Sequence, residues 1–341
     1  MIYANLTEKQ QLRVLDQVNA KIGQDPQTIE KDWWVTQVLR VLFAQPYAEH
    51  LSFKGGTSLS KAWGIIERFS EDIDIAVSRE YLGFTGELSR TQVSDKLRRA
   101  SCSFVRERMQ DDVREGLLAI GIEAEKFHVH VDITSVTTTD PEVIYVDYQS
   151  PLPNAEYIKH TVKVEVSGRS MHEPVESVLL QSQIDSALPD SVVAQPGFEA
   201  SVVVPERTFL EKVMLLHEEF AKPMSEVRTE RMSRHLYDLE RMMRTDIAER
   251  ALRDEALYRT IVEHRRKFIG LRGFDYDSLY PDRLSLEIPT EVLPLWRKDY
   301  EHMQESMIYG DSLPFAELLD EIRQLNARIR ELGYHKKGRN L

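Results

Sequence analysis

The sequence predicts an α+β fold, in which a mixed β-sheet with flanking helices is followed by a helical domain. Four stretches alternate apolar and polar residues with the two-residue period of a half-buried strand. They are residues 73–77, 127–137, 142–148 and 158–167. After Pro205 the apolar residues instead recur at helical spacing, as at Phe209, Val213, Leu216 and Phe220. We therefore predict an α/β domain with N-terminal helices over residues 1–204 and a helical domain over 205–341 that closes a cleft.

The remaining elements follow in chain order. Thr7 is a suitable start for a helix that ends at Gly23, and a second helix follows Pro26. Residues 51–54 are typical of a short strand, residues 57–66 of a helix, and residues 92–118 of a long helix. Pro and Gly between 187 and 198 indicate a loop. A last helix is expected after Pro314, followed by a frayed tail over residues 335–341.

The composition is that of an ordinary soluble globular protein, with 341 residues of which 42% are hydrophobic and 29% charged. A net charge of −12 disfavours nonspecific coating of nucleic acid, because phosphate binding needs an excess of Lys and Arg. It leaves room for a local basic groove or a basic protein partner. The single cysteine, Cys102, excludes internal disulfides and Cys-rich zinc sites and fits a cytoplasmic protein. No signal peptide or membrane span is expected.

The stretch with most chemical information begins at Lys54-Gly-Gly-Thr-Ser-Leu-Ser-Lys61. Two glycines between a strand and a helix let the backbone turn tightly and approach a ligand closely. The first N–H groups of the helix have no partner within it, and the Thr57 hydroxyl adds one more donor. This pattern predicts a phosphate-binding turn, although the spacing of a Walker P-loop is absent.

A pair of carboxylates follows in Arg68-Phe-Ser-Glu-Asp-Ile-Asp-Ile75. Asp72 and Asp74 are two residues apart on a predicted strand, so their side chains share one face. Two parallel carboxylates repel each other unless a cation lies between them, and Mg²⁺ prefers one or two carboxylates together with phosphate oxygens. A phosphate-binding turn about one helix before such a pair predicts metal-assisted nucleotidyl transfer.

These residues resemble the signature of polymerase-β-type nucleotidyltransferases. More narrowly, the sequence is similar to the AbiEii/AbiGii family of toxins from bacterial toxin–antitoxin and phage abortive-infection systems. The likeness covers most of the chain. Comparable family segments are Glu30-Lys-Asp-Trp-Trp34, Glu211-Lys212, Leu236-Tyr-Asp-Leu239, Trp296-Arg-Lys-Asp-Tyr300 and Met307-Ile-Tyr-Gly310.

The resemblance implies a role for each matching position. Gly55, Gly56 and Thr57 would hold the triphosphate, and Asp72 and Asp74 would bind Mg²⁺ or Mn²⁺. Lys212, from the helical half, would neutralise phosphate charge, and Asp238 would lie near the same cleft. Ser70 is placed to touch phosphate, and capping of the strand start is an equally good interpretation.

Two further questions stay open at the level of the sequence. The third metal ligand is predicted to be Glu165, on strand alternation and family likeness, with Asp132 as the alternative. His128, His130 and Asp132 also alternate, so they form a candidate Zn²⁺ or Mn²⁺ site of their own. A polar sheet face is the simpler interpretation of that trio.

Arginines surround Asp238 at helical spacing, at positions 231, 234 and 241. The pattern fits ion pairs on a solvated helix face, and it equally fits a basic strip that binds triphosphate or RNA backbone.

The sequence thus predicts a Mg²⁺-dependent nucleotidyltransferase that moves a nucleotide from an NTP to an acceptor hydroxyl, with RNA, and in particular tRNA, as the expected acceptor. By resemblance it would be a toxin with a cognate antitoxin. The alternatives are an enzyme of the same fold that attaches a nucleotide to a protein, and a non-catalytic nucleotide-binding partner module.

Overall fold

The computed structural model describes residues 1–70, 72–132, 134–153 and 159–334. The chain divides into two compact units, and neither is one continuous stretch of sequence. Unit 1 comprises residues 1–62 and 70–203. Unit 2 comprises residues 63–69 and 204–341. The short segment 63–69 therefore belongs with the C-terminal part of the chain, although it lies between two elements of unit 1.

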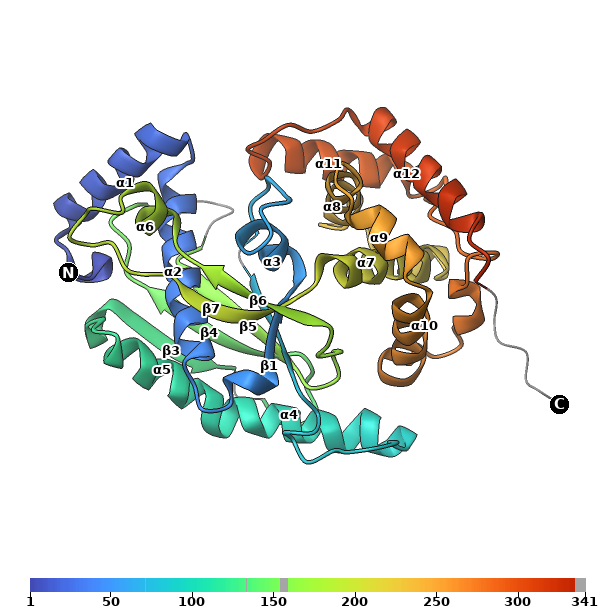
Figure 1. The fold of residues 1–341 in the computed structure, drawn as a ribbon, viewed down its shortest axis with the longest axis horizontal. Coiled ribbons are helices and arrows are strands. Elements are labelled where there is room, and N and C mark those ends of the chain that lie inside the picture. Colours follow the sequence, from blue (N-terminus) through green and yellow to red (C-terminus); the bar gives the residue numbers. More distant parts are fainter. Residues whose placement is uncertain (71, 133, 154–158, 335–341) are drawn as a thin grey trace. The chain divides into compact units, whose positions relative to one another are not determined.

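Unit 1 contains a seven-stranded mixed sheet, coloured from blue to yellow-green in Figure 1. Its strands are β1 (Leu51–Lys54), β2 (Asp72–Val77), β3 (Phe127–Val131), β4 (Glu142–Tyr148), β5 (Thr161–Ser167), β6 (Val175–Leu180) and β7 (Phe198–Val203). Their order across the sheet is β3-β4-β5-β2-β1-β7-β6. The pairs β2/β5 and β1/β7 are parallel, and the other neighbours are antiparallel.

One face of this sheet supplies the core of unit 1. Along β4 and β5, residues at every second position are buried and the residues between them keep part of their exposure. Valines at positions 162, 164 and 166 of β5 are fully buried. Helices α2 (Pro26–Phe43), α4 (Arg98–Phe104) and α5 (Gln110–Ala119) pack against the sheet (Figure 1). The opposite face of the same strands is polar and carries the predicted carboxylates.

The N-terminal helices begin and end as the sequence predicts. Helix α1 (Glu8–Ile22) starts with a capping box between Thr7 and Gln10, and it ends at Gly23, whose φ of 70° suits glycine. In α2, Asp25 accepts a hydrogen bond from the Gln27 amide and Pro26 occupies the first turn. The predicted long helix is one helical run over residues 92–119, with π-helical turns at Gln92–Leu97 and Val105–Met109.

Unit 2 is helical, as predicted from the spacing after Pro205. Its helices are α7 (Pro205–Phe220), α8 (Arg234–Met243), α9 (Ile247–Arg253), α10 (Glu255–His264), α11 (Leu293–Ser306) and α12 (Phe315–Arg330). Their apolar faces meet around Leu216, Leu239 and Trp296, all fully buried. The predicted frayed tail, 335–341, lies outside the described residues.

Three local predictions differ from the structure. The helix expected over 57–66 is α3 (Gly55–Lys61), which ends earlier because the chain then turns through Gly64 at a φ of 63°. The strand expected over 127–137 ends at Val131, which pairs with Ile144 of β4. The strand expected over 158–167 begins only at Thr161, because Lys159 and His160 are not in strand conformation, and residue 158 lies outside the described residues.

In unit 1, one hairpin and one α-helix lie outside the predicted elements. Strands β6 and β7 pair antiparallel, and α6 (Gln183–Ala187) lies between them. β6 is an edge strand in which half of the side chains are exposed and only Leu180 is buried, so it lacks the apolar alternation of a half-buried strand.

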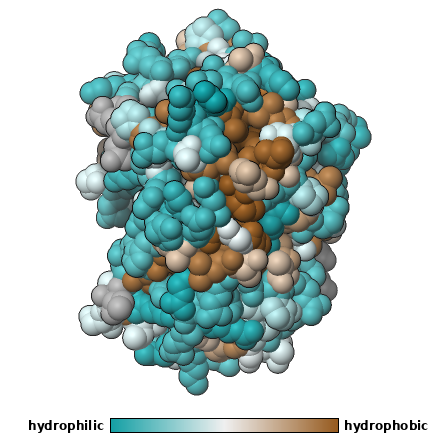
Figure 2. All heavy atoms as spheres, turned by 90° about the vertical axis from the view of Figure 1, so that its left-hand side faces the viewer, coloured by the Kyte–Doolittle hydropathy of each residue, from teal (hydrophilic) through white to brown (hydrophobic). Residues whose placement is uncertain are grey.

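Within the described residues, no helix is long and apolar enough to cross a membrane. Hydrophobic side chains nevertheless reach the surface on the side of unit 1 where the N-terminus lies, where Figure 2 shows them gathered in a band. Met1 and Val192 are the most exposed large hydrophobic residues of unit 1, each 73% exposed, and the Met1 amino group donates to the Val192 carbonyl at 2.8 Å.

Candidate active site

The predicted phosphate-binding turn connects β1 directly to α3. Gly55 has a φ of 82°, a conformation that L side chains rarely adopt. A Cβ built on Gly55 would also stand 2.0 Å from Oδ2 of Asp74. Glycine is therefore required at this position for two reasons, the backbone angle and the close approach of a carboxylate.

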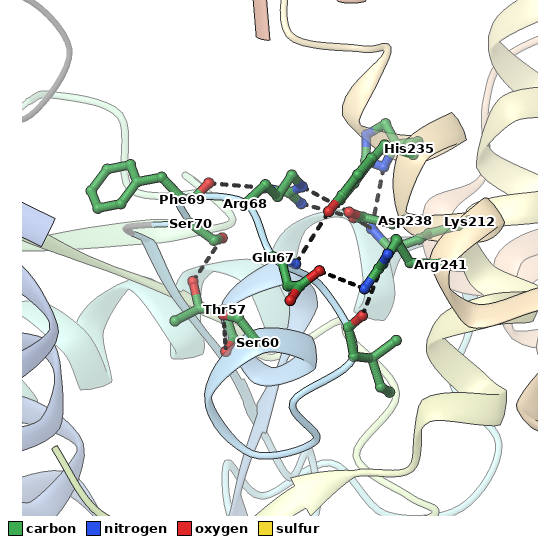
Figure 3. Close-up of polar contacts among 12 residues, drawn as sticks. Thr57, Ser60, Glu67, Arg68, Phe69, Ser70, Lys212, His235, Asp238 and Arg241 are labelled. Atoms are coloured by element: carbon green, nitrogen blue, oxygen red, sulfur yellow. Dashed lines mark hydrogen bonds and ion pairs between the residues drawn. The ribbon is translucent and has the colours of Figure 1, made fainter. Parts of the chain in front are cut away.

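Thr57 and Ser70 connect α3 to the start of β2. The Thr57 hydroxyl donates to the Asp72 carbonyl at 2.5 Å. It also lies 2.9 Å from the Ser70 hydroxyl, a contact drawn in Figure 3. Because Thr57 has one hydroxyl hydrogen, Ser70 is the donor in the second bond. In this arrangement the Thr57 hydroxyl is already used within the protein, whereas the sequence analysis expected it to point at phosphate.

Asp72 and Asp74 extend from the same face of β2, and both are half-buried. Oδ1 of Asp72 is buried and has no hydrogen-bond partner within the described residues. A buried carboxylate oxygen without a donor is costly, so a cation is the partner that this position lacks. The pair of carboxylates has the ligand chemistry that Mg²⁺ prefers.

Glu165 is the residue of β5 that pairs in register with Asp74, and Lys54 of β1 pairs with Asp74 from the other side. The pKa of Glu165 is raised, first by burial and then by the negative charges of Asp74 and Asp72, while Lys54 acts in the opposite direction. Glu165 thus lies in the electrostatic field of both aspartates, and a cation bound there would favour its ionised form.

The alternative ligand, Asp132, follows β3, which is separated from β2 by β4 and β5. His130 of β3 instead stacks on Tyr145 at a ring distance of 5.1 Å and on His128 at 5.3 Å. No three His, Cys, Asp or Glu side chains of the described residues come together as a metal-binding group. The zinc site considered for His128, His130 and Asp132 is therefore not formed, and these residues belong to a polar sheet face.

The predicted residues of the helical half meet in unit 2. Lys212 of α7 lies 2.9 Å from Oδ2 of Asp238 on α8. Asp238 also accepts two bonds from Arg68, from Nε at 2.7 Å and from Nη2 at 2.8 Å (Figure 3). Asp238 has no exposed surface, and the two cations hold its pKa far below the ordinary value despite its burial. The pKa of Lys212 is lowered, mainly by burial.

The interpretation of the arginines around Asp238 as ion pairs on a solvated helix face does not fit the structure, and the basic strip for triphosphate or RNA stays a prediction. α8 begins at Arg234, and Arg231 precedes it with a φ of 57°, so Arg231 is not part of a helical stripe. Asp238 is buried instead of solvated, and Arg241 pairs with Glu67 at 2.7 Å. The pKa of His235 is well below its ordinary value, chiefly because of burial and also because of Lys212.

Sequence reasoning passed over two residues of this region, Lys54 and Arg68. Lys54 is the last residue of β1, directly before the phosphate-binding turn, and it pairs with Asp74 across the sheet. Arg68 is 2% exposed and has a carboxylate partner 170 positions away. Both lie within the two motifs, but the pairing of Lys54 with Asp74 and the bond of Arg68 to Asp238 are visible only in the folded chain.

A sheet with paired carboxylates on one strand and a glycine turn beside them is the arrangement of a nucleotidyltransferase. The match to known families agrees. Residues 37–321 match the family described as the nucleotidyl transferase AbiEii toxin of type IV toxin–antitoxin systems. Because the match covers more than half of the chain, the protein belongs to the AbiEii nucleotidyltransferase toxin family.

The solved structure of one nucleotidyltransferase toxin shows a related fold. The chain resembles MenT4, a nucleotidyltransferase toxin from Mycobacterium tuberculosis, with a TM-score of 0.52 and 17% sequence identity, over 96% of this chain and 91% of that one. JHP933 from Helicobacter pylori gives a TM-score of 0.38 and 16% identity, over 89% of this chain and 98% of that one. No curated protein matches the sequence.

Membership of the family implies an NTP substrate, a divalent metal ion and an antitoxin partner. The residues present fit such a metal ion. Asp72 offers a buried oxygen without a donor, and Asp74 holds its carboxylate against the bare backbone of Gly55.

Proposed function

We propose that this nucleotidyltransferase uses Mg²⁺ to transfer a nucleoside monophosphate from an NTP to a hydroxyl of an RNA acceptor, with tRNA as the expected class. The observation that carries the proposal is the buried, unpartnered Oδ1 of Asp72 on the same sheet face as Asp74. In the described part of the chain this oxygen has no donor, and a metal ion would complete its environment.

The proposal assigns a role to each residue of the turn and the strand. Asp72 and Asp74 would hold the metal ion. Glu165 does not gather with them into a group of three metal-binding side chains among the described residues, so it would have to move to join them as the third carboxylate. The first amides of α3, at Gly55, Gly56 and Thr57, would bind phosphate oxygens through the backbone. Ser70 and the Thr57 hydroxyl would keep these amides in place relative to β2, because they bond to each other and to the Asp72 carbonyl.

In the reaction, the acceptor oxygen would attack the α-phosphorus in line with the departing pyrophosphate. The bond from phosphorus to the bridging oxygen would break, pyrophosphate would leave with the bonding electron pair, and the proton of the acceptor hydroxyl would pass to solvent water. A metal ion held by Asp72 and Asp74 would supply charge stabilisation for the triphosphate and lower the pKa of the attacking hydroxyl. The protein contributes positioning and a fixed electrostatic environment, which are the main sources of rate in this chemistry. The predicted role of Lys212, compensation of phosphate charge, is part of the proposal.

The biological setting follows from the family. We propose that nucleotide addition to RNA stops growth of the host cell, that a cognate antitoxin prevents this, and that the system acts in defence against phage. The family description supports the toxin role.

Label transfer tests the proposal. Purified protein is incubated with Mg²⁺ and each α-labelled NTP in turn, together with total RNA and a cell extract. The test variant is Asp72→Asn/Asp74→Asn. The matched control is Asp147→Asn, a carboxylate of β4 that is 44% exposed and accepts a hydrogen bond from Thr161.

We expect label on an RNA band with the wild type and with Asp147→Asn, and none with the double variant. Label on a protein band would replace the RNA acceptor by a protein acceptor, for which the net charge of −12 is the favouring observation. Equal labelling by wild type and double variant would contradict the proposed metal site.

A further inference from the structure

The residues that come directly before the carboxylate strand are held by unit 2. We call residues 65–69 the lead-in segment. On one side its Glu67 amide donates to the Tyr237 hydroxyl at 3.2 Å, and the Glu67 carboxylate pairs with Arg241 at 2.7 Å (Figure 3). Both partners belong to α8, so this helix fixes the middle of the lead-in segment.

A second part of the C-terminal sequence fixes the other side of the lead-in segment. The Phe69 amide donates to the Met307 carbonyl at 2.8 Å, and the Tyr309 amide donates to the Glu67 carbonyl at 3.0 Å. Arg68 and Ile308 form an antiparallel β-bridge. A Cβ on Gly310 would lie 2.3 Å from Oε2 of Glu67, so only glycine fits this contact without a shift.

Arg68 is the centre of this arrangement. Its guanidinium makes the two bonds to Asp238 and a third, from Nη1 to the Phe69 carbonyl at 3.1 Å. The planar fork of an arginine fixes both the distance and the orientation of its partner, which a lysine cannot do. Asp238 uses both of its oxygens on Arg68, and Oδ2 also accepts from Lys212.

We propose that Arg68 is a positioning residue for the nucleotidyl transfer, and that Asp238 acts on the reaction through Arg68. Arg68 and Asp72 are separated by only three residues in the chain, so the lead-in segment is the direct covalent approach to the carboxylate strand. The Arg68–Asp238 pair fixes the conformation of the lead-in segment within unit 2. The inference rests on the proposed role of Asp72 and Asp74.

Burial supports a positioning role over a purely stabilising one. A buried ion pair is often no more stable than apolar residues of similar volume, because desolvation offsets the attraction. What such a pair supplies is a single geometry. Displacement of reacting groups by about 1 Å can slow an enzyme about 100-fold, so small shifts of the lead-in segment have large effects on rate.

The test uses Arg68→Lys and Asp238→Asn in the full chain. The matched controls are Arg265→Lys and Glu218→Gln, because Arg265 also makes a two-pronged, largely buried pair with a carboxylate of unit 2. That pair has no bond to the lead-in segment among the hydrogen bonds described. Label transfer gives kcat and the KM for NTP, and hydrogen exchange at the Glu67 and Phe69 amides reports the segment itself.

For Arg68→Lys and Asp238→Asn we expect kcat to fall about 10- to 100-fold while KM for NTP changes less than about threefold, since orientation and not substrate binding is lost. The Glu67 and Phe69 amides should exchange faster. The controls should lose similar stability and retain both kcat and the exchange pattern.

Variants that match their controls in kcat and in exchange would overturn the inference. A wild-type protein that transfers no label would contradict the proposed function instead. In that case the exchange comparison still decides whether Arg68 holds the lead-in segment, so the two failures are distinguishable.

Discussion

Two carboxylate environments, one in each unit, show how the same chemical group serves different ends. On β2 in unit 1, Asp72 and Asp74 are half-buried and like-charged, and Oδ1 of Asp72 has no donor among the described residues. On α8 in unit 2, Asp238 is fully buried and bonded to two cations. The negative charges of the first arrangement fit the binding of a metal cation, whereas the charge of Asp238 is balanced by Arg68 and Lys212 of the chain itself.

A third carboxylate, Glu30, is buried like Asp238 but has no cationic partner among its described hydrogen bonds. Glu30 of α2 is 1% exposed, and its bonding partners are neutral hydroxyls, from Tyr3 at 3.2 Å and from Ser150. Burial without a cation raises the pKa of Glu30 to about 7. Together the three sites indicate that burial alone does not identify a carboxylate that binds a metal ion. The better indicator is a buried carboxylate oxygen that has no hydrogen-bond donor or cation within the described protein, as at Asp72.

The largest expected effect is that of removing the Asp72 carboxylate. Asp72→Asn should lower kcat at least about 1000-fold, because the metal ion loses a charged ligand, while the free energy of unfolding changes by less than about 1 kcal/mol. Label transfer and urea unfolding measure the two quantities. A variant that loses stability as well as activity would remove the contrast with Asp238.

Next in size is the satisfied carboxylate. Asp238→Ala should lower the free energy of unfolding by about 3–5 kcal/mol, because Arg68 and Lys212 would remain buried without their counter-charge. The pKa of Asp238 lies far below its ordinary value, so this stabilisation is present above about pH 4 and declines as the pH falls below it. Urea unfolding at pH 7 checks the size.

The control for Asp238 is Asp320→Ala, from an exposed pair with Arg323, which should cost less than about 0.5 kcal/mol. Equal losses for the two variants would show that the buried pair stabilises no more than a surface pair.

A smaller effect separates Gly55 from an ordinary turn glycine. Gly55→Ala should lower kcat about 100-fold, because the added Cβ would displace the Asp74 carboxylate. Gly83 has a similar φ of 88° and open space around it, so Gly83→Ala should bear only the backbone cost of about 1 kcal/mol and leave kcat unchanged. If both variants lose activity alike, the contact with Asp74 is not what requires glycine at position 55.

The smallest effect concerns the pH dependence of Glu30. Its pKa in the fold is raised, so its contribution to stability is complete below about pH 4 and is lost as the pH rises through about 7. Between pH 4 and pH 8, the free energy of unfolding of Glu30→Gln should therefore fall by about 2–3 kcal/mol less than that of the wild type. Thermal unfolding across this range measures the difference, and parallel curves for the two proteins would contradict the raised pKa.

Much of the fold could be predicted because local patterns determine it. The cap at Thr7, the stop at Gly23 and the alternation of β2, β4 and β5 each depend on neighbouring residues alone. The glycine turn and the carboxylate pair were visible for the same reason.

What local patterns could not show is the pairing of distant segments. The register that places Glu165 beside Asp74 is fixed by the sheet, and β6 escaped notice because an edge strand has few buried positions. The role of Arg68 depends on Asp238, which is 170 positions away in the chain. The hydrophobic pattern around either residue does not indicate that the two pair. The bonds of the Thr57 hydroxyl were likewise set by Ser70 and Asp72.

The interleaving of the two units has a consequence for dissecting this protein. The chain passes from one unit to the other after residues 62, 69 and 203, so no single cut yields two complete pieces. A fragment that stops at Val203 would keep residues 63–69 but lose every partner that they have in the C-terminal sequence. Truncation mutants would therefore confuse loss of a domain with loss of folding, because any continuous piece that contains all of unit 2 also contains residues 70–203 of unit 1.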